Sequence, residues 1–284
     1  MLGSLPAPSL YRRYKDRYNR EENVMRNIAT ALVAVTALLT SAVVVAAKDA
    51  SLTIVPSLDF GFKQSNLKLS EDGAPFRSAF NPSYLTLIPT LVAADGQFYA
   101  ALSYDTPLTE YNTATVGDGV NSPAYTDHRY TRQETTLNLG YRLLPALSIF
   151  AGYLNGETQV HYIEYTGNPL TPDPSFDIFK SEGYFAGVTT SRSFDGKGTL
   201  TLSAAYALLD ASYVFISPAE SASIKSQDAS GYSTSLSWTG PMGDSVFYRI
   251  GYRYARYIYK FKNEDSLKIE EPVRGLTFGV SKYF

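Results

Sequence analysis

The sequence RGLTFGVSKYF, residues 274–284, alternates between apolar residues and small or polar ones almost until the chain ends. Leu276, Phe278 and Val280 lie on one face of an extended segment, and glycine, threonine and serine lie on the other. This period of two predicts a β-strand. The segment ends on an aromatic residue, Phe284, although chain termini usually fray in water. We therefore expect the end of this chain to lie against an apolar phase.

The same alternation recurs beyond residue 50, where no helical period is sustained. Nine further segments carry apolar residues at alternate positions: residues 51–63, 85–91, 98–104, 137–143, 147–153, 184–188, 200–208, 232–238 and 246–254. With the final segment they make ten candidate strands of an all-β protein. An even number of antiparallel strands is typical of a transmembrane up-and-down β-barrel.

The apolar faces of these segments carry almost no charge, and Lys282 is an exception that is in phase with the last of them. A soluble sandwich would bury such faces, whereas a membrane barrel turns them toward lipid, where a charge at mid-bilayer costs about 2–4 kcal/mol. Aromatic residues gather at segment ends, as the girdles of membrane barrels require. The candidates for the membrane interface are Phe60, Tyr104, Tyr153, Trp238, Tyr252, Tyr254 and Phe284. We therefore predict a transmembrane antiparallel barrel of about ten strands.

Short and long connections alternate between the predicted strands. The short ones cover residues 94–96, 144–145, 194–197 and 240–244, and the long ones cover residues 65–81, 106–130, 163–180, 215–226 and 262–270. Short turns of bacterial barrels face the periplasm and long loops face outside, so we expect both ends of the barrel chain in the periplasm. Pro56 and Pro89 fall within predicted strands, where each removes a hydrogen-bond donor. They predict a bulge or a strand boundary.

The closing segment, with Phe284 last and apolar residues at 276, 278 and 280, resembles the C-terminal motif by which Gram-negative outer-membrane proteins are recognised for barrel assembly. The chain departs from that motif at Lys282, where the family usually has an apolar residue. The resemblance implies a small porin-like barrel over residues 48–284, located in the outer membrane. It also implies outer-membrane lipid, lipopolysaccharide and the barrel-assembly machinery as partners.

Residues 1–47 differ from the rest of the chain. Arg26 precedes an apolar run, residues 28–47, that ends in the small residues Ala46 and Ala47. This order is typical of a secretory signal peptide, with an uncleaved membrane anchor as the alternative because about 18 apolar residues can span a bilayer. Residues 25–47 form the signal proper in this interpretation, and translation starts at either Met1 or Met25.

The composition argues against several classes of function. The 284 residues include no cysteine, so a disulfide framework and a thiolate metal site are excluded. Residues 1–47 hold six bases and three acids of the 25 and 27 in the chain, which leaves 19 bases against 24 acids and a net charge of −5 for the rest. A nucleic-acid partner is not expected for such a chain. No cofactor and no metal site are predicted.

Charged residues on the polar faces are the candidates for lining the lumen. They are Asp59, Lys63, Arg132, Glu134, Arg142, Arg249 and Arg253. Small residues on the predicted neighbouring strands leave room for Arg249 and Arg253, and Asp59 and Lys63 are expected roughly 10 Å away, two strands around the barrel. Barrels of about eight strands are filled by side chains, and those of about 16 hold an open channel. Ten strands therefore predict a narrow or obstructed lumen.

Two functions are open for such a lumen, and the one that we favour is a narrow porin-like conduit for small polar solutes, which a charged constriction would make selective. A network of ion pairs would instead block the lumen and leave a structural or surface-binding barrel, for which the long outer loops are suited. The acidic residues Glu264, Asp265, Glu270 and Glu271 are expected to be solvated at the rim.

An outer-membrane protease is the minor alternative, because proteases of the omptin family share the strand count of ten. Members of that family resemble one another by paired aspartates and an Asp–His pair near the outer rim. The histidines of this chain are His128 and His161, and only Asp127 stands beside one of them, without an acidic pair. Neither a GxSxG nor an HExxH motif is present. We therefore expect no enzymatic activity and assign no catalytic residue.

Overall fold

The computed structural model describes residues 52–70, 77–109, 111–116, 125–166, 171–216, 221–261 and 267–284. The predicted leader and signal peptide, residues 1–47, lie outside the described residues. The described chain forms 13 strands: β1 (Leu52–Ser65), β2 (Leu67–Ser70), β3 (Arg77–Phe80), β4 (Ser83–Asp95), β5 (Phe98–Pro107), β6 (Tyr111–Val116), β7 (Tyr125–Leu144), β8 (Leu147–Thr166), β9 (Thr171–Phe194), β10 (Gly198–Ile216), β11 (Ser221–Pro241), β12 (Val246–Phe261) and β13 (Lys268–Lys282). No helix capable of crossing a membrane occurs among these residues.

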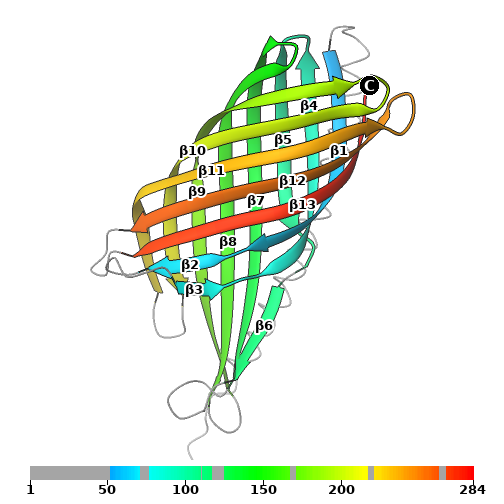
Figure 1. The fold of residues 1–284 in the computed structure, drawn as a ribbon. Coiled ribbons are helices and arrows are strands. Elements are labelled where there is room, and N and C mark those ends of the chain that lie inside the picture. Colours follow the sequence, from blue (N-terminus) through cyan, green and yellow to red (C-terminus); the bar gives the residue numbers. More distant parts are fainter. Residues whose placement is uncertain are drawn as a thin grey trace, which may run out of the picture. The chain divides into compact units, whose positions relative to one another are not determined.

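Ten of the strands close into a ring. β1 pairs antiparallel with both β4 and β13, and the ring continues through β5, β7, β8, β9, β10, β11 and β12. Figure 1 shows this ring as a barrel of tilted strands. β2 and β3 extend the sheet from β13, and β6 pairs with β7. The predicted ten-stranded up-and-down barrel is confirmed.

The two ends of the ring differ. At one end, called the turn end below, short turns join β4 to β5, β7 to β8, β9 to β10 and β11 to β12. Gly96 and Gly196 adopt φ values of 55° and 66° in two of these turns, a conformation that glycine reaches without steric cost. The C-terminal Phe284 also lies there, and its N–H donates to the carbonyl of Ile54 at 3.1 Å. At the opposite end, the loop end, β6, β7 and β8 reach beyond the ring (Figure 1).

The predicted long loops are wrong in extent, because strands continue into them. β7 begins at Tyr125 and β9 at Thr171, so much of residues 106–130 and 163–180 is paired strand. His161 of β8, for example, is in register with Arg129 on one side and Phe176 on the other. The alternation of apolar and polar residues is needed only where a strand contacts lipid, whereas backbone pairing continues beyond that level. The sequence pattern therefore underestimates the strands at the loop end.

Neither the bulge nor the strand boundary predicted at Pro56 and Pro89 is found in the described pairings, since the two prolines lie within β1 and β4. The β1–β4 register runs without a shift past both prolines. Pro56 lies one residue before the first β1–β13 pair, Ser57 with Ser281, and the β4–β5 pairing is interrupted at Ile88 and Pro89. Each missing N–H donor therefore coincides with a gap in the pairing.

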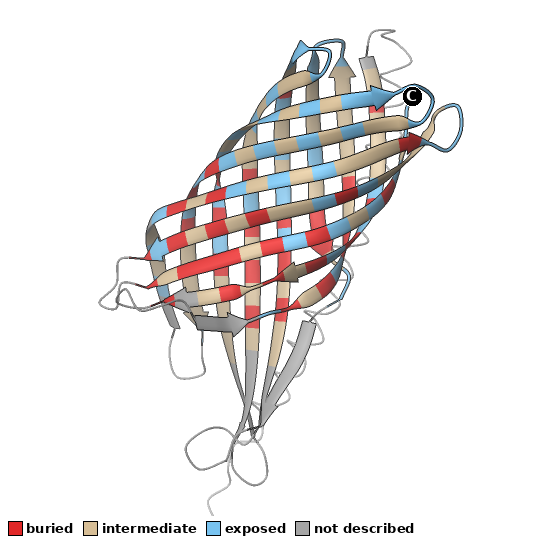
Figure 2. Cartoon of the chain, in the orientation of Figure 1, coloured by how far each residue is buried: buried red, intermediate tan, exposed pale blue. Residues whose placement is uncertain are grey.

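Side chains alternate between a lipid-facing and a lumenal face. Large apolar side chains point outward, including Phe62, Leu202 and Phe278, each more than half exposed. Charged residues such as Glu134 and Glu271 are buried inside the ring. Figure 2 shows the buried residues gathering toward the loop end of the barrel. This distribution reverses that of a soluble protein, and the transmembrane barrel predicted from the sequence has the expected polarity.

Candidate functional site

An outward row of polar residues marks the loop-end margin of the apolar face. Arg274 Nε donates to Gln64 Oε1 at 2.9 Å between β13 and β1. On the other side of the ring, Glu182 and Asp210 are in register on β9 and β10, and both are exposed. Carboxylates and guanidinium groups on the outer face require water or lipid headgroups. The row therefore sets the loop-end limit of contact with hydrocarbon.

Three of the aromatic residues predicted for the interface lie beside this polar row. The hydroxyl of Tyr153 donates to Glu182 Oε2 at 2.8 Å, and that of Tyr104 donates to Gln133 Oε1 at 3.2 Å. Tyr254 is in register with Arg274. These rings combine an apolar body with a hydroxyl at the margin, which suits the headgroup level.

The other predicted interface aromatics occupy two different levels. At the turn end, Trp238 Nε1 donates to Tyr248 Oη at 3.1 Å, and the Lys282 ammonium lies 4.6 Å from the ring centre of Phe284. Tyr252 and Phe60 lie deeper on the apolar face. They are 43% and 55% exposed, and Phe60 lies four residues from Gln64 on the same face of β1.

A first group of ionic contacts centres on Glu271 of β13, which is fully buried. Its carboxylate accepts hydrogen bonds from Arg132 Nη1 at 2.8 Å, Tyr130 Oη at 2.7 Å and Thr158 Oγ1 at 3.0 Å. Arg132 and Tyr130 come from β7, which is separated from β13 by β1, β4 and β5 in the ring. These contacts therefore cross the lumen. The predicted solvation of Glu270 and Glu271 is wrong, while Glu264 and Asp265 lie outside the described residues.

A second group centres on Glu134 of β7. Its carboxylate accepts from Arg132 Nη2 at 3.1 Å, Arg253 Nη1 at 2.9 Å and Tyr257 Oη at 2.7 Å. The guanidinium of Arg132 also lies 4.6 Å from the ring centre of Tyr257, within range of a cation–π contact. Because Arg253 and Tyr257 belong to β12, these bonds also connect opposite sides of the ring.

Two further ion pairs use residues of β1. Asp59 pairs with Arg249, and Lys63 pairs with Asp105 of β5. Arg249 lies two strands from Asp59, and the β13 residue between them in the register is Gly279. The absent side chain at 279 leaves the space in which the aspartate and the guanidinium meet. This arrangement is the one that the row of small residues predicted.

Asp105 and Glu271 were not among the residues predicted to form lumenal ion pairs. The alternation of residues along each strand places both side chains on the lumenal face. Glu271 is in phase with Gly275 and Gly279 on the lumenal face of β13, and Asp105 stands on the polar face of its strand. Arg142, by contrast, was predicted with the lumenal group but lies near the end of β7, is exposed, and is in register with Ser148 at the turn end.

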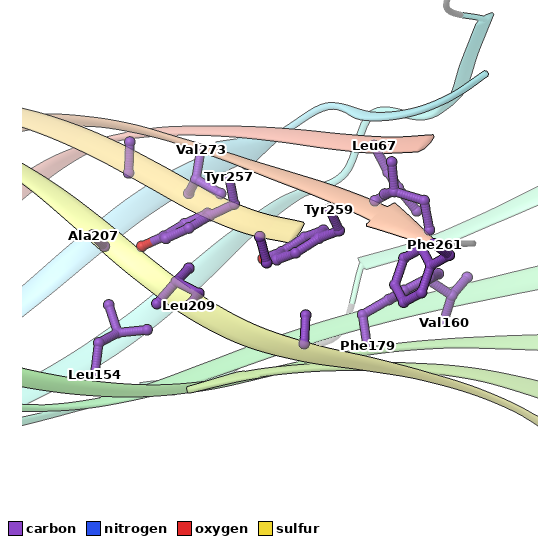
Figure 3. Packing of buried hydrophobic residues seen from close by; sticks show 14 of the residues in the cluster. Leu67, Leu154, Val160, Phe179, Ala207, Leu209, Tyr257, Tyr259, Phe261 and Val273 are labelled. Atoms are coloured by element: carbon purple, nitrogen blue, oxygen red, sulfur yellow. The ribbon is translucent and has the colours of Figure 1, made fainter. Parts of the chain in front are cut away.

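Aromatic and aliphatic side chains fill the lumen on the loop-end side of the ion pairs. Figure 3 shows Tyr257, Tyr259, Phe179 and Phe261 packing from β12 and β9 into this cluster. Tyr84, Tyr130 and Tyr259 are at most 2% exposed. The cluster contains Leu67, Tyr84, Tyr130, Leu154, Val160, Phe179, Ala207, Leu209, Ala211, Ala229, Ala255, Tyr257, Tyr259, Phe261, Leu267, Ile269 and Val273. We call this cluster and the ion pairs on Glu134 and Glu271 the lumenal seal.

The lumen opens on the turn-end side of the seal, as the change in exposure along single strands shows. On β10 the inward residues Ser203 and Ala205 are half-buried, whereas Ala207 and Leu209 are buried. On β12 the side chain of Arg253 is 39% exposed, although Ala255 is buried. We call this accessible half of the lumen the vestibule.

A cavity of about 240 Å³ lies in the vestibule. Its wall includes hydroxyl-bearing residues from β5, β7, β9, β10 and β11, the rings of Phe150 and Phe185, and the side chains of Arg253 and Tyr257. A smaller cavity of about 40 Å³ borders Lys63, Arg132 and Glu134 within the seal. The barrel therefore combines a filled half and a hollow half.

The histidines lie in the extension beyond the polar row. The ring of His161 stacks on that of Phe176, with centroids 4.2 Å apart. Asp127 and His128 are consecutive residues of β7. Among the described residues, no group of three or more His, Cys, Asp or Glu side chains is arranged to hold a metal ion.

Neither a protein-family model nor a curated protein sequence matches this chain. Solved structures do match it. The outer membrane protease OmpT from Escherichia coli aligns with a TM-score of 0.58 and 14% identity, over 82% of this chain and 97% of that one. The translocator domain of autotransporter NalP from Neisseria meningitidis aligns with a TM-score of 0.43 and 10% identity, over 92% and 98%. At this identity the likeness to OmpT shows the fold alone, and this chain therefore shares its barrel architecture with a bacterial outer-membrane protein.

Proposed function

We propose that this protein is an outer-membrane barrel closed toward the cell surface by its lumenal seal, and that it acts as a structural or surface-binding protein. The observation that carries this proposal is the burial of lumenal side chains. Tyr130, Thr158, Val160 and Glu271 are all fully buried although they point into the ring. A water-filled pore would leave such residues accessible.

In this proposal the turn end faces the periplasm and the loop end faces outside, as in bacterial barrels in general. The paired strands β6, β7 and β8 then project from the cell surface (Figure 1). Outward-projecting segments on a rigid scaffold are common positions for binding. Lipid at the apolar face, lipopolysaccharide at the polar row and the assembly machinery at β13 complete the proposed partners.

The test is conductance of the purified full-length chain in a planar bilayer, with a known porin as positive control. We expect no steady pore current. The double variant Tyr130→Ala/Tyr259→Ala removes two buried rings from the seal and should introduce a current, because both side chains fill the lumen. Tyr184→Ala, a change on the outer face at a residue 75% exposed, is the matched control and should stay silent. Steady currents from the unmodified chain would overturn the proposal.

The second candidate is a narrow conduit for small polar solutes. The exposure of the Arg249 and Arg253 side chains, 32% and 39%, favours it because both guanidinium groups border the vestibule. In this case the unmodified chain would conduct, and Arg249→Ala/Arg253→Ala would change the current or its ion preference. The absence of a pore current from the unmodified chain would exclude the conduit.

The proposal assigns no enzymatic activity. The stacking of His161 on Phe176 supports a packing role for that imidazole. Peptide cleavage by the purified chain, lost in His128→Ala, would contradict this part of the proposal.

A further inference from the structure

We propose that the vestibule is a binding site for a small hydroxylated carboxylate, with Arg253 holding the carboxylate group. The site is the 240 Å³ cavity on the turn-end side of the seal. The cavity borders the seal and shares Arg253 and Tyr257 with it, but it lies on the turn-end side, so this inference does not depend on the seal being tight.

The charge of the cavity wall favours an anion. Arg253 is the one charged residue among the described residues that line the cavity. Its partner Glu134 lies behind it with a side chain 6% exposed, whereas the side chain of Arg253 is 39% exposed. Arg253 uses Nη1 for Glu134, and a guanidinium carries five N–H donors in a planar fork. Donors therefore remain for a carboxylate, which matches such a fork.

The rest of the wall favours a ligand with hydroxyl groups. Ser203, Ser233 and Ser235 lie on adjacent strands, and Ser235 is in register with both Ser203 and Arg253. Thr136 and Thr189 add hydroxyls from β7 and β9. Hydroxyl side chains both donate and accept hydrogen bonds, as the hydroxyls of a polyol do. The arrangement therefore surrounds the cation with groups suited to a hydroxylated chain.

The volume limits the size of the ligand. An engineered protein cavity of about 150 Å³ holds benzene. By proportion, a cavity of 240 Å³ accommodates about ten non-hydrogen atoms. This size corresponds to a short hydroxy acid.

The experiment compares two probes on the full-length chain in detergent micelles by isothermal titration calorimetry. Erythronate is a four-carbon hydroxylated carboxylate, and erythritol is the neutral polyol with the same carbon skeleton. We expect erythronate to bind at least about tenfold more tightly, because it adds a charge-assisted contact with Arg253. Equal affinities, or no binding of either probe, would overturn the inference.

Two variants and one control localise the site. Arg253→Gln removes the charge and should weaken erythronate at least about tenfold while leaving erythritol unchanged. Ala205→Leu leaves the ion pairs intact, fills part of the cavity and should weaken both probes. Arg274→Gln is the matched control, because Arg274 is exposed on the outer face of the barrel. Emission from the single Trp238 verifies folding of each variant. Unchanged erythronate binding in both Arg253→Gln and Ala205→Leu would reject this location, whatever the conductance measurements give.

Discussion

At the residue scale, the lumen depends on glycines that give ionic side chains their space. A Cβ atom at position 279 would overlap Asp59 Oδ1 and lie 2.8 Å from the carbonyl oxygen of Leu58. At position 275 it would lie 2.8 Å from Lys63 Cγ. All three contacts are closer than a Cβ atom tolerates. The glycines of β13 are therefore required by the ion pairs of β1 and need no conformational explanation.

Gly279→Ala tests this requirement. The methyl group should displace Asp59 from Arg249 and lower the free energy of unfolding by about 1–3 kcal/mol. Reversible urea unfolding in detergent measures the difference. Gly243→Ala is the matched control, since no atom lies within 4 Å of its added Cβ, and its effect should be about 0.5 kcal/mol or less. An equal effect of both variants would contradict the steric argument.

Glu134 pairs with two arginines inside the seal. Glu134→Gln preserves its shape but leaves Arg253 without its carboxylate partner and Arg132 with Glu271 alone. We expect a loss of about 3 kcal/mol in the free energy of unfolding, because breaking a buried pair leaves an uncompensated charge. Glu182 is an exposed carboxylate on the outer face. Glu182→Gln should therefore lower the free energy of unfolding by about 0.5 kcal/mol or less. An unchanged free energy of unfolding in Glu134→Gln would show that the pairs contribute nothing to stability.

At the element scale, β10 shows how one strand serves lipid and lumen together. Its outward residues from Leu200 to Leu208 are exposed, and the next outward residue is Asp210. Nine residues extend about 30 Å, which covers about 23 Å of height at a usual tilt of about 40°. This agrees with an apolar band of about 25 Å. The inward residues Ser203 and Ala205 are small, so they leave the vestibule open.

A charge placed at two levels of β10 should therefore have different costs. Leu202→Arg introduces a cation in the apolar face and should reduce stability by about 2–4 kcal/mol. Asp210→Arg changes the same face of the same strand at the polar row and should cost about 1 kcal/mol or less. Unfolding from lipid vesicles, rather than micelles, is the measurement, because it preserves the depth of the bilayer. Equal costs would mean that the polar row does not mark the membrane margin.

At the scale of the whole molecule, the period of two was sufficient to predict the ring. Lipid restricts every outward residue within the bilayer, so strand number, polarity and the positions of the four short turns could be derived from alternation. The same restriction ends at the polar row. Beyond it, β7 and β8 continue with polar residues such as Arg129 and His161, and the pattern gave no indication of strand.

The seal was only partly predictable for a different reason. The alternation along a strand shows which side chains point into the lumen, and in this way Glu134, Arg132 and Arg253 were identified. Whether two such side chains meet depends on ring curvature and on strands far apart in sequence, as in the contact between Arg132 and Glu271, 139 residues apart. The division into a filled and a hollow half arises from these contacts. No local pattern carries that information.

Closure of the ring through β1 and β13 is testable because the chain has no cysteine. Leu58 and Val280 are register partners on the outer face, and paired positions lie about 4.5–5.5 Å apart, within the range of a disulfide. We expect Leu58→Cys/Val280→Cys to form an intramolecular disulfide on oxidation, detected as faster migration of the denatured chain in non-reducing electrophoresis. Leu202→Cys/Leu236→Cys, a register pair of the β10–β11 hairpin, is the positive control, and Leu58→Cys/Leu202→Cys, on strands that do not pair, is the negative control. A disulfide in the hairpin pair but none in the Leu58→Cys/Val280→Cys pair would mean that the sheet is open between its first and last strands, and the lumen with its seal would then lose its enclosing wall.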